Sequence, residues 1–135
     1  MPHESPINMK TKIYDQHVEH GEWMNKLLFY GVEMKIMQKR LDDICTKSPD
    51  QDALKQVEHF QNQIIIQSAH ITDLTKHIKG EEKMLANNIK ENIVASDHRS
   101  IEDHSEERQM VEQFEKNFND LRKEFNLFLS TQSNH

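Results

Sequence analysis

Apolar positions recur at alternating steps of four and three residues through the first third of the chain. This spacing keeps one face of an α-helix turned toward partner helices. The same face carries two histidines near its beginning, and a parallel row of large apolar residues at every seventh position widens it. The pattern predicts a long helix from about Met9 to Cys45. The positions on its buried face are Ile13, His17, His20, Met24, Leu27, Gly31, Met34, Gln38, Leu41 and Cys45, flanked by Trp23, Tyr30, Met37 and Ile44.

Two more segments follow the same rhythm and predict two more long helices. The turn between the first two helices is expected at 46–50, with Ser48 as a cap and Pro49 at the first helical position. The pattern predicts an all-α, up-down-up bundle of three long helices. The second seam comprises Leu54, Val57, Phe60, Ile64, Gln67, Ile71, Leu74, Ile78, Glu81 and Leu85, and the third comprises Ile101, His104, Val111, Phe114, Phe118, Leu121, Phe125 and Phe128.

The segment 86–96 is ambiguous, because asparagines weaken a helix there while Ile89 and Ile93 stay in phase with the second seam. We expect the second helix to end near Asn88 and a packed loop to follow. The alternatives are a helix that continues to Val94 or a short fourth helix near 82–94. Residues 1–135 are expected to form one domain, with 1–8 and 131–135 disordered.

Composition narrows the class of protein. A net charge of -6 with a pI near 5.8 disfavours nucleic acid or an anionic membrane as a partner. One cysteine allows no internal disulfide, no signal peptide is recognisable, and the longest apolar run is too short to span a bilayer. We therefore expect a soluble cytoplasmic protein. Helices of ~35 residues present long faces that three helices cover thinly, so a homo-oligomer is expected.

Nine histidines are many for 135 residues, and the topology predicts that several of them meet. Antiparallel helices pair residues that are equally distant from their turn. His20 and His77 each lie 27 residues from the residue flanking the first turn, Lys47 and Asp50 respectively. If a loop replaces the end of the second helix, His104 lies within ~3 Å of the same height, at 1.5 Å per residue.

The residues expected to bind a divalent transition metal at this end of the bundle are His20, His77, Glu81 and His104, with His17 and His98 close behind. Imidazoles with one carboxylate suit zinc or iron, and also copper or nickel. Few other carboxylates are expected to point inward, Glu82 and Glu107 being the further candidates. That shortage favours a single ion over a carboxylate-bridged di-iron centre, while a second ion using His17 or His98 remains an alternative.

A second interpretation makes the histidines structural, each bonded to a neighbouring carboxylate, and the protein a non-catalytic oligomeric scaffold. His59 and His70 lie away from the expected site and are interpreted as structural or exposed. The chain contains no Gly-rich phosphate loop and no Gly-x-Ser-x-Gly nucleophile motif. Nothing in the sequence indicates a substrate or decides whether the protein is an enzyme.

The histidine and acidic motifs carry a family resemblance. The chain is similar to an uncharacterised bacterial family of small His-rich helical-bundle proteins, in the stretches His20–Trp23, Glu58–Gln63 and His77–Glu81, and at Asp97-His98 and Asp103-His104. It resembles hemerythrin-like and ferritin-like bundles only loosely, because it has neither a Glu-x-x-His nor a His-x-x-x-His step. The resemblance to the small bundles implies no particular activity.

Overall fold

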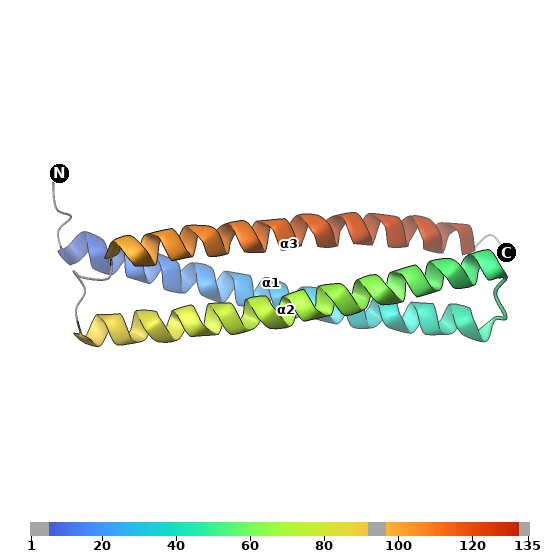
Figure 1. The fold of residues 1–135 in the computed structure, drawn as a ribbon, viewed down its shortest axis with the longest axis horizontal. Coiled ribbons are helices and arrows are strands. Elements are labelled where there is room, and N and C mark those ends of the chain that lie inside the picture. Colours follow the sequence, from blue (N-terminus) through green and yellow to red (C-terminus); the bar gives the residue numbers. More distant parts are fainter. Residues whose placement is uncertain (1–5, 92–96, 133–135) are drawn as a thin grey trace.

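A computed structural model describes residues 6–91 and 97–132, and side chains within 12–87 and 102–132. The chain folds into three helices, α1 (Pro6–Thr46), α2 (Gln51–Glu91) and α3 (Asp97–Gln132). The helices run up, down and up and pack side by side along their length (Figure 1). No strand occurs in the described ranges, which confirms the all-α bundle. None of the three helices has a stretch long and apolar enough to cross a membrane, as far as the described residues go.

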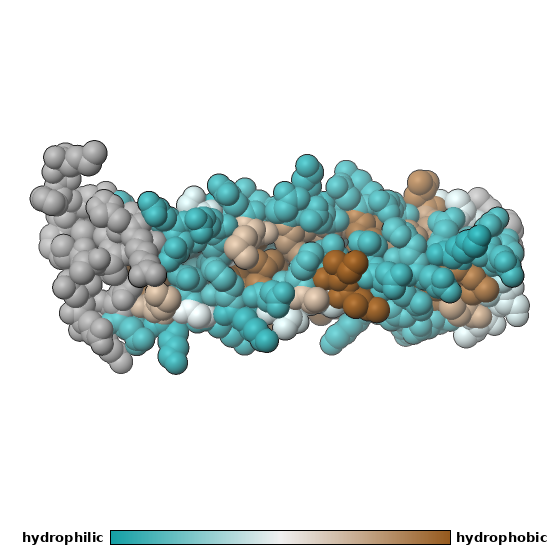
Figure 2. All heavy atoms as spheres, viewed as in Figure 1, coloured by the Kyte–Doolittle hydropathy of each residue, from teal (hydrophilic) through white to brown (hydrophobic). Residues whose placement is uncertain are grey.

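The core runs the length of the bundle and is made largely by the three predicted seams. Three predicted seam positions, His17, Cys45 and Leu54, are exposed instead. Aromatic rings from all three helices meet inside it: Tyr30 lies 4.6 Å from Phe118, and Phe60 lies 5.3 Å from both Phe125 and Phe128, between ring centroids. Polar side chains cover most of the surface in view, with a few apolar groups gathered near its middle (Figure 2). The buried core residues are Trp23, Leu27, Met34, Met37, Leu41, Val57, Phe60, Ile64, Leu74, Ile78, Val111, Phe114, Phe118, Leu121, Phe125 and Phe128.

Several helix boundaries differ from the predicted ones. α1 begins at Pro6, three residues early, because proline is well tolerated in a first helical turn. The predicted cap of α2 is wrong: Ala53 donates its backbone N–H to the Asp50 carboxylate at 2.8 Å, and α2 starts at Gln51. Ser48 instead takes a left-handed φ of 52° in the turn. α2 extends to Glu91.

The end of α2 therefore lies three residues beyond the predicted Asn88. The helix therefore continues through Asn87 and Asn88, so the weak helix propensity of the asparagines does not end it. The proposed loop is shortened to 92–96, which lies outside the described residues. Similarly, residues 6–8 and 131–132 are helical, although both had been expected to be disordered.

Ion pairs repeat at every heptad along the interface between α1 and α3. Glu19 pairs with Arg108, then Lys26 with Glu115 and Glu33 with Arg122, at closest distances of 2.5, 3.1 and 2.6 Å. The three pairs have the same sequence separation of 89 residues. Their repetition shows that the two parallel helices keep one axial alignment over this stretch.

The axial alignment of α1 with α2 differs from the symmetric pairing that the turn predicted. His20 contacts Glu82, and Met34 contacts Ser68. Both partners on α2 lie five residues further from the turn than symmetric pairing predicts. His20 is therefore level with Glu82 and not with His77, and this shift decides which carboxylates surround the histidines.

Candidate metal centre

His20 lies at the centre of a cluster of histidines and carboxylates toward the N-terminal end of α1. Its side chain is 2% exposed and donates Nδ1–H to Glu82 and Nε2–H to Glu107, both at 2.6 Å. Burial opposes a charge on the ring, but the two carboxylates outweigh it and raise the pKa of His20 above the ordinary value. In the metal-free protein, His20 is therefore favoured as an imidazolium held between two carboxylates.

Glu107 of α3 is the innermost carboxylate and is 0% exposed. One oxygen accepts from His20 Nε2, and the other accepts from His77 Nδ1 of α2 at 2.5 Å. Burial alone would raise the pKa of Glu107, but these two hydrogen bonds overcome it and lower the pKa. Glu107 thus joins one histidine from each of the other two helices.

His104 approaches the cluster from α3, one helical turn before Glu107. Its side chain is 7% exposed and donates Nε2–H to Glu19 at 3.0 Å. Arg108 holds the same carboxylate through two hydrogen bonds, and this pairing lowers the pKa of Glu19. The ring of His104 stacks on Trp23 at 4.9 Å and lies 5.0 Å from the ring of His20. Both its plane and its tautomer are therefore fixed.

The other ring nitrogen of His104 has no hydrogen-bond partner within the part of the chain that the structure describes, although it is buried. With Nε2–H given to Glu19, Nδ1 carries a lone pair. An unpartnered buried nitrogen costs about 1–3 kcal/mol relative to a satisfied one. A metal ion would satisfy it, since a metal-bound histidine ordinarily donates its second nitrogen to a carboxylate, as His104 does to Glu19.

Two sets of potential ligands arise among the described residues, and they share Glu107. In each set the ligand atoms lie within 4.8 Å of one another. The first set, His20, His104 and Glu107, is wholly buried, while the second, His77, Glu81 and Glu107, reaches the surface. Two imidazoles with one carboxylate are a common ligand set for zinc and for non-haem iron. The residues present therefore fit a transition metal by type as well as by position.

The predicted ligands take different places in the cluster. His20, His77, Glu81 and His104 all belong to the two ligand sets. His17 is exposed and donates to Glu82 at 2.8 Å, so it supports the carboxylate that holds His20.

His59 and His70 lie apart from the cluster. The side chain of His98 lies outside the described residues. His59 and His70 are exposed, as expected, and His59 faces Glu124 of α3.

Glu107 has a larger role than the sequence indicated. The sequence spacing could have identified this residue as buried. The steps from His104 to Glu107 and from Glu107 to Val111 are three and four residues, so Glu107 occupies a seam position of α3. A carboxylate in the middle of an apolar seam indicates a buried charge that needs partners. Glu19 and Glu82 lie on helix flanks, where periodicity gave no comparable signal.

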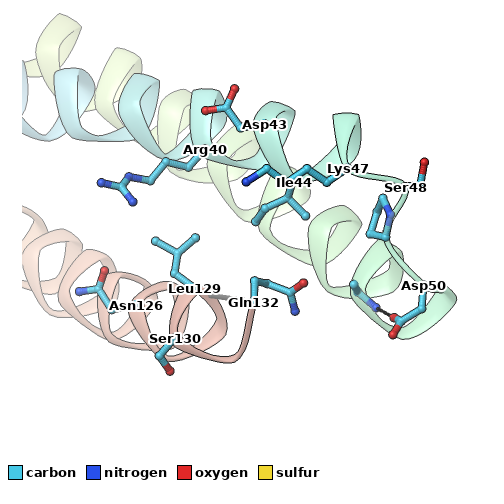
Figure 3. A pocket seen from close by; sticks show the side chains of 12 residues that line it. Arg40, Asp43, Ile44, Lys47, Ser48, Asp50, Asn126, Leu129, Ser130 and Gln132 are labelled. Carbon is cyan, nitrogen blue, oxygen red and sulfur yellow. Dashed lines mark hydrogen bonds between the residues drawn. The ribbon is translucent and has the colours of Figure 1, made fainter. Parts of the chain in front are cut away.

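A hollow lies at the opposite end of the bundle, near the α1–α2 turn. It measures about 820 Å³ and is bordered by α1, the turn, the start of α2 and the end of α3 (Figure 3). Its charges are mixed, with Arg40 and Lys47 beside Asp43 and Asp50. The one hydrogen bond drawn there is the helix cap made by Asp50. Nothing in this lining matches the convergent histidines of the other end.

Comparison with family models, with characterised proteins and with solved structures gives no match to this chain.

Proposed function

We propose that the protein binds a divalent transition-metal ion, zinc or iron, through His20, His104 and Glu107. The ligands come from α1 and α3, and the ring nitrogens and carboxylate oxygen involved lie within 4.8 Å of one another. His20 donates Nδ1–H to Glu82, which leaves its Nε2 for the ion. His104 donates Nε2–H to Glu19, which leaves its Nδ1 for the ion. The ion would replace the proton now shared between His20 and Glu107.

The observation that carries the proposal is the buried Nδ1 of His104, which has no hydrogen-bond partner among the described residues. A purely structural histidine would be expected to use both nitrogens, because burying an unsatisfied one is costly. Here Glu19 and Trp23 hold the ring through Nε2 and the ring face, and a ring nitrogen of His104 lies within 4.8 Å of ligand atoms of His20 and Glu107. Metal-binding histidines are typically held in orientation in this way by residues that contact the ring but do not bind the ion.

Three protein ligands leave at least one position of a four-coordinate ion open. An ion with an open position polarises a bound water or a substrate oxygen, which is the basis of metal-assisted hydrolysis and of redox chemistry with small molecules. The function that we propose is therefore metal binding with a capacity for metal-assisted chemistry.

The exposed free thiol of Cys45 suits a reducing compartment, so we place the protein in the cytoplasm.

Metal content and tryptophan fluorescence test this proposal. The full chain, purified without a histidine tag or nickel column, is freed of metal by chelation and titrated with Zn²⁺ and Co²⁺. Trp23 is the only tryptophan and stacks on His104, so Co²⁺ at the site should quench its fluorescence. We expect saturable binding in the parent chain. His104→Ala should weaken it by at least about 100-fold, because removing a ligand costs more affinity than removing a residue that only hydrogen-bonds to a ligand.

The matched control is His70→Ala, which removes an exposed histidine of α2 and should change neither signal. Circular dichroism verifies that each variant remains helical. The proposal is refuted if the parent chain binds no stoichiometric metal, or if His104→Ala and His70→Ala bind it equally well.

A second candidate function is a self-associating scaffold, and the outer face of α1 favours it. Large apolar side chains are exposed there with helical spacing: Val18, Phe29, Val32 and Ile36, with Leu28 beside them. Such a row is typical of a helix that packs against another chain. A homo-oligomer would bury it. Sedimentation of the parent and of Val32→Glu tests this: a monomer at high micromolar concentration for both would exclude the scaffold.

A further inference from the structure

We propose that a second divalent transition-metal ion binds beside the first, held by His77, Glu81 and Glu107, so that Glu107 bridges the two ions. The inference rests on the proposed function, because it shares one ligand with the first site. It goes beyond that function by making the centre dinuclear and by drawing α2 into it. All three helices would then be joined through metal.

The orientation of Glu107 is the first observation that supports a bridge. Its Oε1 faces Nε2 of His20, and its Oε2 faces Nδ1 of His77. The two oxygens are thus directed at histidines from different helices and different ligand sets. When a carboxylate holds one ion on each oxygen, the ions lie about 3.5–4 Å apart, the separation usual in two-metal sites.

The arrangement of His77 and Glu81 is the second observation. They lie four residues apart on α2 and therefore on the same face of the helix. Together with Glu107 they place one nitrogen and two carboxylate oxygens within 4.8 Å of one another. Because this set contains a ring nitrogen, it differs from a chance group of surface carboxylates. Its ligand types suit the same divalent transition metals as the first set.

Repulsion between carboxylates is the third observation. Glu81 is partly buried, and the carboxylates of Glu107 and Asp103 lie close enough to repel its charge. Three carboxyl groups are thus crowded beside one partly exposed histidine. A divalent cation among them would offset both the burial and the mutual repulsion, because an opposite charge favours the ionised form of each carboxylate.

The two sites differ in their access to solvent. His20, His104 and Glu107 are buried, whereas the side chain of His77 is 41% exposed and Glu81 is partly exposed. The second ion would therefore face water, exchange faster and bind more weakly than the first. Its open positions would be the ones that an exogenous ligand can reach.

Metal stoichiometry and electron paramagnetic resonance test the bridge. The metal-free full chain is dialysed against increasing Zn²⁺, and bound metal is measured per chain. We expect two ions of unequal affinity in the parent chain, and one in Glu81→Gln or His77→Ala. Asp73→Asn, an exposed carboxylate of α2, is the matched control and should retain two. With Mn²⁺, a bridged pair should show spin coupling that Glu81→Gln abolishes.

The outcomes separate this inference from the function on which it rests. No bound metal in the parent chain overturns both. One ion that is lost in His104→Ala but kept in Glu81→Gln supports the first site and overturns the second. Two ions without spin coupling overturn the bridge. Glu107→Gln should weaken both ions at least about 10-fold; if this variant does not fold, Glu81→Gln and the Mn²⁺ spectrum decide.

Discussion

Replacing Glu19 by Gln should separate its role at the metal centre from its role as an ion-pair partner. Glu19 accepts from His104 Nε2 at 3.0 Å and pairs with Arg108. Glutamine keeps the shape and an acceptor oxygen but removes the charge that favours one tautomer and makes the imidazole a stronger ligand. The expected loss of metal affinity is about 10–100-fold, which equals ~1.4–2.8 kcal/mol.

The effect on folding should be much smaller. The side chains of Glu19 and Arg108 are 30% and 44% exposed, so solvent screens their attraction. Such pairs contribute at most about 1 kcal/mol. For a domain of this size that is a fall of roughly 3–5 °C in melting temperature for the metal-free protein. The affinity change should therefore exceed the stability change.

Glu33→Gln is the matched control. Glu33 pairs with Arg122 two heptads further along the same interface, also between α1 and α3 and also partly exposed. It should show a similar small loss of stability and no change in metal affinity, because no histidine contacts it in the described contacts. Calorimetric titration with Zn²⁺ measures affinity, and thermal melting by circular dichroism measures stability. Equal Zn²⁺ affinities for the two variants would refute an orienting role for Glu19.

Three further predictions concern the metal-free protein. Because the folded protein raises the pKa of His20, this residue stabilises the fold fully below pH 6.5, the ordinary pKa of histidine, and the stabilisation is lost as pH rises through the folded-state pKa. Because the folded protein lowers the pKa of Glu107, this residue stabilises the fold fully above pH 4.5, the ordinary pKa of glutamate, and the stabilisation is lost as pH falls through the folded-state pKa. The melting temperature of the metal-free protein should therefore be highest between about pH 4.5 and 6.5, and a steady rise of the melting temperature to pH 8 in the presence of a chelator would contradict this. With metal bound, the melting temperature should instead rise with pH, since imidazoles must lose protons to bind the ion. Phe118→Ala should lower the free energy of unfolding by about 3–5 kcal/mol in urea titrations, because the ring is fully buried against Tyr30, and a loss under 1 kcal/mol would contradict the packing. Gly31→Ala should raise that free energy by up to ~1 kcal/mol, since a methyl group there meets no atom within 4 Å, and destabilisation would show that this space is filled.

The periodicity of the sequence determined the helices, most of their buried faces and their up-down-up order. Seam positions such as Leu27, Leu41 and Phe118 are buried as predicted, because a helix fixes the angular position of every residue about its own axis. His20 and His104 could be assigned to the interior on the same basis. The boundaries at Pro6 and Asp50 were less well determined, since local capping competes with propensity there.

The tertiary structure decided which polar groups meet. Periodicity gives the face of a helix but not its axial position against a neighbour, which depends on the turn at Ser48 and on side-chain packing along the whole interface. The observed alignment, five residues from symmetric pairing, brings Glu82 to His20 and makes Glu107 the shared centre. A shift of five residues is about 7.5 Å along a helix, more than the separation of any two ligand atoms in a metal site. A ligand set depends on distances finer than that shift, so only the packed helices could define it.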